Sequence, residues 1–217
     1  MAVSNIENMW LDVQALWRHP LWRRRLLNKS VSIISNDCWG GFLYRYLHLP
    51  FNSPFIGLFV MPEDFVKILE DPSMLEGELT FISKAESRHL QHIHHTADYP
   101  VGLLPSGVEI HFLHYPSAEV ARSKWNRRVK RIDWNNAIIK LSDNYYITDE
   151  TMRRFDALPY PQKVLFTGKP HPELECACYL PEFRKDGRTA ERIHKVFHRH
   201  WDFIAHANAL THNTDRQ

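Results

Sequence analysis

The chain has 217 residues, of which 44% are hydrophobic and 24% are charged, and its formal net charge is +2. This composition is that of an ordinary globular protein, and the length fits one domain that buries a core without disulfides or metals. The small net charge gives no reason to expect a nucleic acid or an acidic surface as the partner.

The N-terminal segment 6–28 carries apolar residues at helical spacing, among them Trp10 and Trp17. Pro20 interrupts this pattern, so we expect two helical pieces with a kink between them. The second piece carries the arginines 23–25, which we interpret as a solvated basic face. Contact of these arginines with a partner or a membrane surface is the alternative.

Short runs of β-branched and aromatic residues between polar turns predict strands further along the chain. The expected strands are 31–35, 55–60, 79–83, 108–113, 137–141, 164–167 and 175–180. Amphipathic stretches that follow N-capping residues such as Ser117 and Thr148 predict helices. The expected helices are 42–47, 62–70, 118–131, 149–158 and 189–209.

Strands alternate with helices along most of the chain, which predicts a mostly parallel sheet with helices on both faces. We therefore expect an α/β fold with a single three-layer, Rossmann-like core domain over residues 29–182. A helical extension over residues 1–28 precedes this core, and a C-terminal helix and tail over residues 183–217 follow it.

Three cysteines, at positions 38, 176 and 178, make no disulfide framework, so we expect a reducing compartment. The N-terminus lacks the basic start and apolar run of a signal peptide. The longest apolar run, 55–61, is far shorter than the roughly 20 residues that span a membrane. These features predict a cytoplasmic protein with no integral membrane span.

The turn after the first strand is the strongest candidate site, because ligands gather at the carboxyl ends of strands in open α/β sheets. Asn36, Asp37 and Cys38 place an amide, a carboxylate and a thiol there, just before a helix whose N–H groups bind anions. A thiol near a helix N-terminus is expected to have a lowered pKa, which makes it a better nucleophile than an ordinary cysteine thiol. Gly40 and Gly41 let a ligand or another backbone approach closely. The alternative is a tight turn with Cys38 as a small buried side chain.

Two further strand ends carry polar side chains. His114 follows the strand 108–113, where a general base is useful, although it also suits a residue that orients the turn. Asp143 follows the strand 137–141 and is suited to orient a histidine, bind a sugar hydroxyl or hold a cation. Ordinary turn chemistry explains Asp143 equally well.

The helix 118–131 is strongly basic on the side away from the core. Asn126, Arg127 and Arg128 lie on this surface, where guanidinium groups match the oxygens of a phosphate. We expect these residues to hold the phosphates of an activated donor, and the alternative is a solvated charged face.

Two groups of histidines lack the cysteines or the H-E-x-x-H spacing that metal sites require, so we expect no metal site. These histidines are His89, His92, His94, His95, His194, His198 and His200.

Several unrelated short motifs occur in order along residues 29 to 182, and together they resemble one bacterial family. The motifs are 33–41, 49–54, 99–102, 109–116, 124–128, 140–143 and 155–160. The family is the domain of unknown function nineteen-nineteen (DUF1919), whose members often carry the label "exopolysaccharide biosynthesis protein". In the family the residue before the cysteine is often Asn, where this chain has Asp37.

The resemblance implies a role in bacterial surface polysaccharide, such as exopolysaccharide, capsule or lipopolysaccharide, and makes a saccharide or a polysaccharide precursor the expected partner. Acyl transfer from acetyl-CoA to a sugar hydroxyl is the favoured reaction. In this reaction the basic helix binds the donor phosphates, His114 with Asp143 deprotonates the hydroxyl, and the 36–41 turn stabilises the oxyanion. No firm cofactor follows beyond this co-substrate.

Two alternatives to acyl transfer stay open. A glycosyltransferase would hold a nucleotide-sugar on the same helix and use Asp143 or Asp37 as base or cation ligand, but no D-x-D pair is present. A non-enzymatic protein would bind polysaccharide or associate peripherally with a polysaccharide assembly complex, using its seven tryptophans and eight tyrosines for stacking.

Overall fold

The computed structural model describes the backbone of residues 5–93, 97–143, 147–187, 189 and 192–214. Its strands are β1 (Ser32–Ser35), β2 (Thr80–Ile82), β3 (Val101–Leu103), β4 (Glu109–His111), β5 (Ala137–Ser142), β6 (Lys163–Thr167) and β7 (Ala177–Tyr179). Its α-helices are α1 (Asn5–Arg25), α2 (Trp39–Leu47), α3 (Pro62–Glu70), α4 (Ala118–Val129), α5 (Asp149–Asp156), α6 (Ile193–Val196) and α7 (Phe203–Thr214).

A four-stranded sheet with the order β1-β5-β6-β7 forms the centre of the molecule, and its neighbouring strands are all parallel. Every residue of β1 and β5 is buried. Burial of whole strands requires cover on both faces, which is the usual condition of a parallel sheet. The prediction of an α/β fold with a mostly parallel sheet is therefore confirmed.

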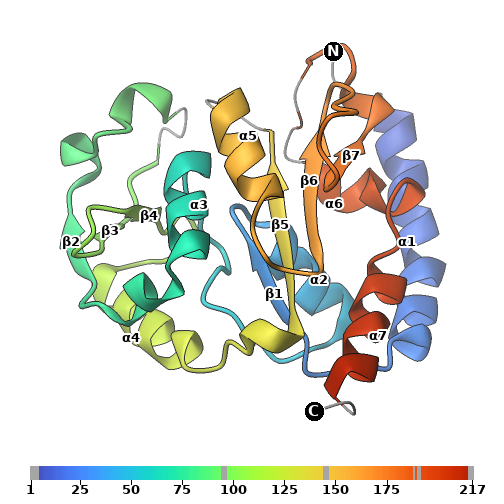
Figure 1. Ribbon diagram of the computed structural model, residues 1–217, viewed down its shortest axis with the longest axis horizontal. Helices are drawn as coiled ribbons and strands as arrows, with labels where there is room; N and C mark the ends of the chain where they lie inside the picture. Colours follow the sequence, from blue (N-terminus) through green and yellow to red (C-terminus); the bar gives the residue numbers. More distant parts are fainter. Residues whose placement is uncertain (1–4, 94–96, 144–146, 188, 190–191, 215–217) are drawn as a thin grey trace.

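Two hydrophobic cores lie on opposite faces of this sheet, because neighbouring strand residues point to opposite sides. Ile33 faces the first, which we call the helical core, formed with α1, α2, α6 and α7. Ile34 faces the second, which we call the mixed core, formed with α3, α4, α5 and a second sheet. Figure 1 shows α3 and α5 on one side of the parallel strands and α1 and α7 on the other.

The second sheet is antiparallel, with the order β2-β3-β4, and it lies in the long segment between β1 and β5. The sequence predicted one mostly parallel sheet and did not indicate this separate antiparallel sheet. The sequence also failed to predict β3, whose central residue is Gly102. A Cβ atom at this position would lie 2.8 Å from the side chains of Leu79 and Phe112, so close packing requires the glycine.

Two predicted elements differ in form. Residues 55–60 are extended but form only an isolated bridge between Phe59 and His111, because Gly57 turns the chain with a φ of 69°. The predicted C-terminal helix is divided into α6 and α7, since the Asp202 carboxylate accepts bonds from the N–H groups that begin α7.

The N-terminal segment is one helix, α1, with Pro20 inside it, and the prediction of two pieces is wrong. Pro20 removes a single backbone hydrogen bond, and the turns on either side are fixed by packing. The buried side chains Leu11, Trp22 and Leu26 hold α1 against the helical core. Within the described part of the chain, no helix combines the length and apolar character needed to cross a membrane.

Candidate functional site

The carboxyl ends of β1 and β5 lie side by side, since the parallel register pairs Ser35 with Lys140. Asn36 joins the two ends: its Oδ1 accepts a bond from the backbone N–H of Ser142, 3.2 Å away. The side chain is 1% exposed, and its Nδ2 has no hydrogen-bond partner among the described residues. A buried donor of this kind normally finds a partner, so it marks this strand end as unusual.

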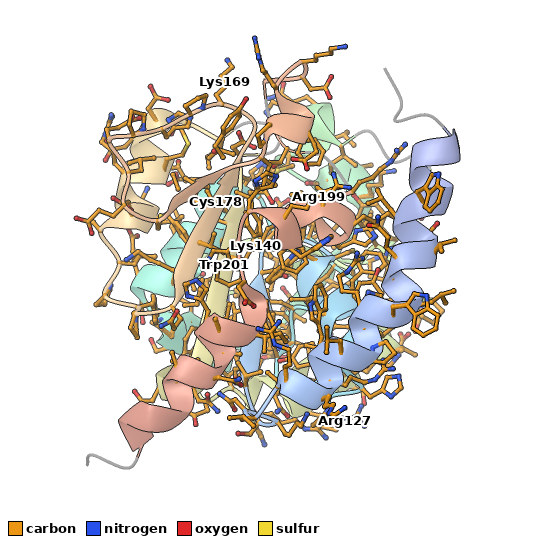
Figure 2. All side chains as sticks on the ribbon, turned by 90° about the vertical axis from the view of Figure 1, so that its right-hand side faces the viewer. Arg127, Lys140, Lys169, Cys178, Arg199 and Trp201 are labelled. Carbon is orange, nitrogen blue, oxygen red and sulfur yellow. The ribbon has the colours of Figure 1, made fainter. Side chains whose placement is uncertain are left out.

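Lys140 forms the centre of the site. The side chain is completely buried in the interior of the molecule (Figure 2). Its Nζ donates to Oδ2 of Asp37 at 2.5 Å and to Oγ of Ser142. Ser142 Oγ in turn donates to the same Asp37 oxygen at 3.1 Å. The side chain of Asp37 is 24% exposed, so this carboxylate links the buried ammonium to solvent.

Burial and the ion pair act against each other on these two groups. Burial alone would raise the pKa of Asp37, but the charge and hydrogen bond of Lys140 outweigh it and lower that pKa. Burial lowers the pKa of Lys140, and the Asp37 carboxylate opposes this shift. Asp37 is therefore held as a carboxylate at neutral pH, and its charge favours the protonated form of Lys140.

Side chains of the predicted turn accept hydrogen bonds from the first backbone N–H groups of α2. Asp37 Oδ1 accepts from the N–H of Trp39 at 3.0 Å, and Ser35 Oγ accepts from the N–H of Gly40 at 3.0 Å. A Cβ atom on Gly40 would lie 2.8 Å from Ser35 Oγ, so this glycine lets α2 pack on β1. Gly41 is also buried, and a Cβ atom there would lie 3.5 Å from the side chain of Ile56, an ordinary contact distance. The backbone N–H groups of Trp39 and Gly40 are therefore already hydrogen-bonded within the protein, and both glycines are buried.

Cys38 is half-buried and directly precedes α2. Its Sγ lies 3.9 Å from the carbonyl oxygen of Leu58 and within electrostatic range of Lys140 and Tyr115. The Tyr115 hydroxyl donates to the carbonyl oxygen of Ile56 at 2.7 Å. The thiol thus lies beside the ionic cluster, between the ends of two strands and the 56–58 segment.

His114 is exposed, and its backbone N–H donates to the carbonyl oxygen of Gly57 at 3.0 Å. A Cβ atom on Gly57 would lie 3.3 Å from the Cβ of His114. The next residue, Tyr115, lines an open hollow of about 400 Å³ together with Phe81, Lys84 and Tyr99. Tyr115 therefore contacts both the hollow and the surroundings of Cys38.

The basic helix α4 differs from the prediction in one residue. Asn126 and Arg127 are exposed, as a binding surface requires. Arg128 is 6% exposed, so its placement on the surface was wrong. Its Nη1 donates to the hydroxyl of Tyr115 at 2.8 Å, and its guanidinium lies over the ring of Phe51. Arg128 therefore supports Tyr115 from within.

Asp143 is 7% exposed and follows β5. Its two carboxylate oxygens accept bonds from the backbone N–H groups of Gly168 and Thr189, both at 2.6 Å. These contacts fix the segments after β6 and before α6. His114 bonds through its backbone to Gly57, whereas Asp143 bonds through its carboxylate to Gly168 and Thr189. No hydrogen bond between these two residues is seen among the described residues.

A second polar cluster lies at α3, and it includes His89, one of the histidines for which the sequence predicted no metal site. His89 Nε2 lies 3.3 Å from Oδ2 of the buried Asp64, which also pairs with Arg88 and accepts from the N–H of Glu109. Oε2 of Glu109 accepts from the Ser87 hydroxyl at 2.5 Å. This cluster joins α3 to β4. Two of the other histidines considered in the sequence, 94 and 95, lie outside the described residues.

Three residues of the site, Lys140, Ser142 and Tyr115, had no role predicted from the sequence. A signal for Lys140 was present, because a lysine inside the otherwise apolar run 137–141 must be buried with a partner. Tyr115 carried no comparable signal.

The chain belongs to the family described as "Domain of unknown function (DUF1919)", whose model matches residues 14–206. It is also similar to a Haemophilus influenzae protein named "Uncharacterized protein". The two are 36% identical over 170 residues, which cover 78% of this chain and 77% of that protein.

Proposed function

We propose that this DUF1919 member transfers a group, with acyl transfer favoured, to a hydroxyl of a bacterial surface polysaccharide or its precursor. The observation that carries the proposal is the buried Lys140, paired with the partly exposed Asp37 at the strand ends beside Cys38. Burial of charge is costly, and ionisable groups with shifted pKa values gather at functional sites. The polysaccharide context rests on the resemblance of residues 29–182 to proteins with that label.

In the reaction that we favour, the oxygen of a sugar hydroxyl attacks the carbonyl carbon of an acyl thioester such as acetyl-CoA. The carbon–sulfur bond breaks, the thiolate of the donor leaves, and the hydroxyl proton passes to a base. Asp37 stays ionised because of Lys140 and accepts a hydrogen bond from the acceptor. The exposed His114 is the base that we assign, and the thiolate takes up a proton from solvent.

The surroundings of the site suit these two substrates. Arg127 on α4 is exposed and is available to phosphates of a donor. The hollow beside Tyr115 has aromatic side chains, with Lys84 and Asp98 as polar groups, which suits a saccharide. A cytoplasmic location and a Rossmann-like core over residues 29–182 belong to the same proposal.

A nucleotide-sugar would use the same exposed Arg127 for its diphosphate, so glycosyl transfer is the second candidate. Thermal-shift measurements with CoA, acetyl-CoA and nucleotide-sugars separate the two. A donor at about 100 times its Kd adds about 2.7 kcal/mol of stability. We expect acetyl-CoA to raise the melting temperature by about 5–10 °C for a chain of this size.

The wild type should also release free CoA from acetyl-CoA in the presence of a hydroxyl acceptor, and the Cys38→Ala variant tests whether the thiol takes part. Full activity in Cys38→Ala would show direct transfer without an acyl-cysteine. A shift with nucleotide-sugars alone would replace acyl transfer by glycosyl transfer. If no donor changes the melting temperature while an oligosaccharide does, the protein is a polysaccharide-binding protein and the transferase proposal is wrong.

A further inference from the structure

The outer face of α1 is apolar and uncovered. Large hydrophobic side chains that are exposed occur at seven places in the described chain, and six of them lie between residues 10 and 27. The six are Trp10, Val13, Leu16, Trp17, Leu21 and Leu27. Trp17 is 81% exposed and Leu16 is 71% exposed. Single exposed apolar residues are common, but a concentration on one helix indicates an interaction surface.

The helix cannot turn this face inward, because its opposite face is already attached. Trp22 is buried in the helical core, and the ring of His19 stacks on Tyr46 with their centroids 3.9 Å apart. Arg23 Nη1 donates to the carbonyl oxygen of Tyr46 at 2.8 Å. The outward side chains are therefore a fixed feature of the folded protein.

Trp10, Val13, Trp17 and Leu21 follow one another at helical spacing and form a straight stripe of roughly 16 Å. Arg24 is exposed and continues the same face, seven residues after Trp17. Figure 1 places α1 along the edge of the molecule, on the side away from the antiparallel sheet, and Figure 2 looks onto the side that carries it. A convex, straight stripe fits a flat surface better than a groove.

The segment that carries the stripe is basic. Residues 10–29 contain five basic residues and one acidic residue, so their formal net charge is +4, whereas the whole chain has +2. The acidic residue, Asp12, is paired with Lys195 at 2.7 Å. The apolar stripe thus lies in a basic segment of the protein.

We propose that α1 docks the protein on an anionic phospholipid surface, with the stripe inserted at the interface and Arg24, at the end of the stripe, against the headgroups. Tryptophan and arginine together are the residues that interfacial helices use. A second copy is a poorer occupant, because it would bring two segments of charge +4 together. The helix would lie on the membrane, which agrees with the lack of a membrane-spanning helix in the described chain.

Co-sedimentation with vesicles tests the proposal. The full chain should bind vesicles of phosphatidylglycerol and phosphatidylcholine, and bind vesicles of phosphatidylcholine alone much more weakly. Trp17→Ala should weaken binding to the anionic vesicles about ten-fold or more, from the lost apolar area. Arg24→Gln should weaken it about five-fold, as expected for one basic residue near the surface.

Leu90→Ala is the matched apolar control, since Leu90 is the one large exposed hydrophobic residue of the described chain that lies outside this segment. Lys130→Gln is the charge control, on the exposed end of α4. Both should bind like the wild type, and all variants should keep the melting temperature because their side chains are exposed. Equal binding to both kinds of vesicle, or an unchanged Trp17→Ala, would overturn the proposal. So would a dimer that sedimentation velocity detects without vesicles and that Trp17→Ala dissociates, if no vesicle is bound.

Discussion

Asp37 and Lys140 form an ion pair whose two members are unequally exposed. Lys140 is completely buried, whereas 24% of the Asp37 side chain reaches solvent. Among the described residues, removal of the carboxylate would leave the Lys140 amine in the interior with the Ser142 hydroxyl as its one side-chain hydrogen-bond partner. An unpaired buried charge costs several kcal/mol, while an apolar replacement of both partners is often neutral. The pair is therefore better explained by function than by stability.

We predict that Asp37→Asn lowers the free energy of unfolding at pH 7 by about 3–5 kcal/mol. The double variant Asp37→Asn with Lys140→Met should recover most of this loss, because it removes the charge as well. Urea unfolding of the wild type, both single variants and the double variant measures the coupling. Glu150→Gln, at an exposed pair with Arg153, should change stability by less than about 0.5 kcal/mol. A loss below about 1 kcal/mol in Asp37→Asn would contradict a buried ion pair.

The position of this site was predictable from the sequence, but its chemical centre was not. Asn36, Asp37 and Cys38 stand out because they interrupt an apolar strand before a helix. Their partner Lys140 is more than one hundred residues away, and only the parallel register brings it beside Ser35. His114 and Asp143 are equally prominent in the sequence, as polar residues at strand ends. The Asp143 carboxylate, however, bonds to the backbone N–H groups of Gly168 and Thr189. Strand order decides such contacts, and one sequence does not contain it.

The attachment of α1 depends on two histidines that are neutral in the folded protein. Burial and the neighbouring Arg18 lower the pKa of His19 to about 4, and the same two causes lower the pKa of His198 to about 4. The unfolded value is near 6.5. The stabilisation is therefore complete above about pH 6.5 and is lost as the pH falls from 6.5 toward 4.

Acid should therefore release α1 before the parallel sheet unfolds. Each histidine contributes a slope of at most about 1.4 kcal/mol per pH unit, reduced for His19 by its contact with solvent. Hydrogen exchange at pH 7 and pH 5, corrected for intrinsic rates, should show a greater loss of protection in α1 than in α3. His198→Gln should reduce this difference, and His200→Gln, which removes a histidine paired with Glu182, should not. Equal loss in α1 and α3 would be evidence against the prediction.

Elements with a complete local pattern were predicted well. The start of α3 at Pro62 and the caps of α4 at Ser117 and of α5 at Thr148 agree with the sequence. Elements defined by distant packing were not: β3 is short and centred on Gly102, and residues 55–60 turn at Gly57. In both places the glycine is required by a close neighbour, which propensity and periodicity cannot indicate.

At the scale of the whole molecule, the parallel sheet belongs to both cores. The successive residues Ile33 and Ile34 of β1 are each completely buried, one in the helical core and the other in the mixed core. Loss of either core would expose one face of β1 and β5, whose residues are all buried in the folded protein. The two cores should therefore unfold together, although few direct contacts join their helices.

We predict that Ile33→Ala and Ile34→Ala each lower the free energy of unfolding by about 2–5 kcal/mol, as for other large-to-small changes in a core. Each change should reduce the protection of the slowest-exchanging amides in α2 and in α3 by the same amount, because these amides open only with the whole sheet. Hydrogen exchange measured by mass spectrometry follows both helices in one experiment. If Ile33→Ala loosened α2 and left α3 unchanged, the two faces would be separate folding units and the shared sheet would not couple them.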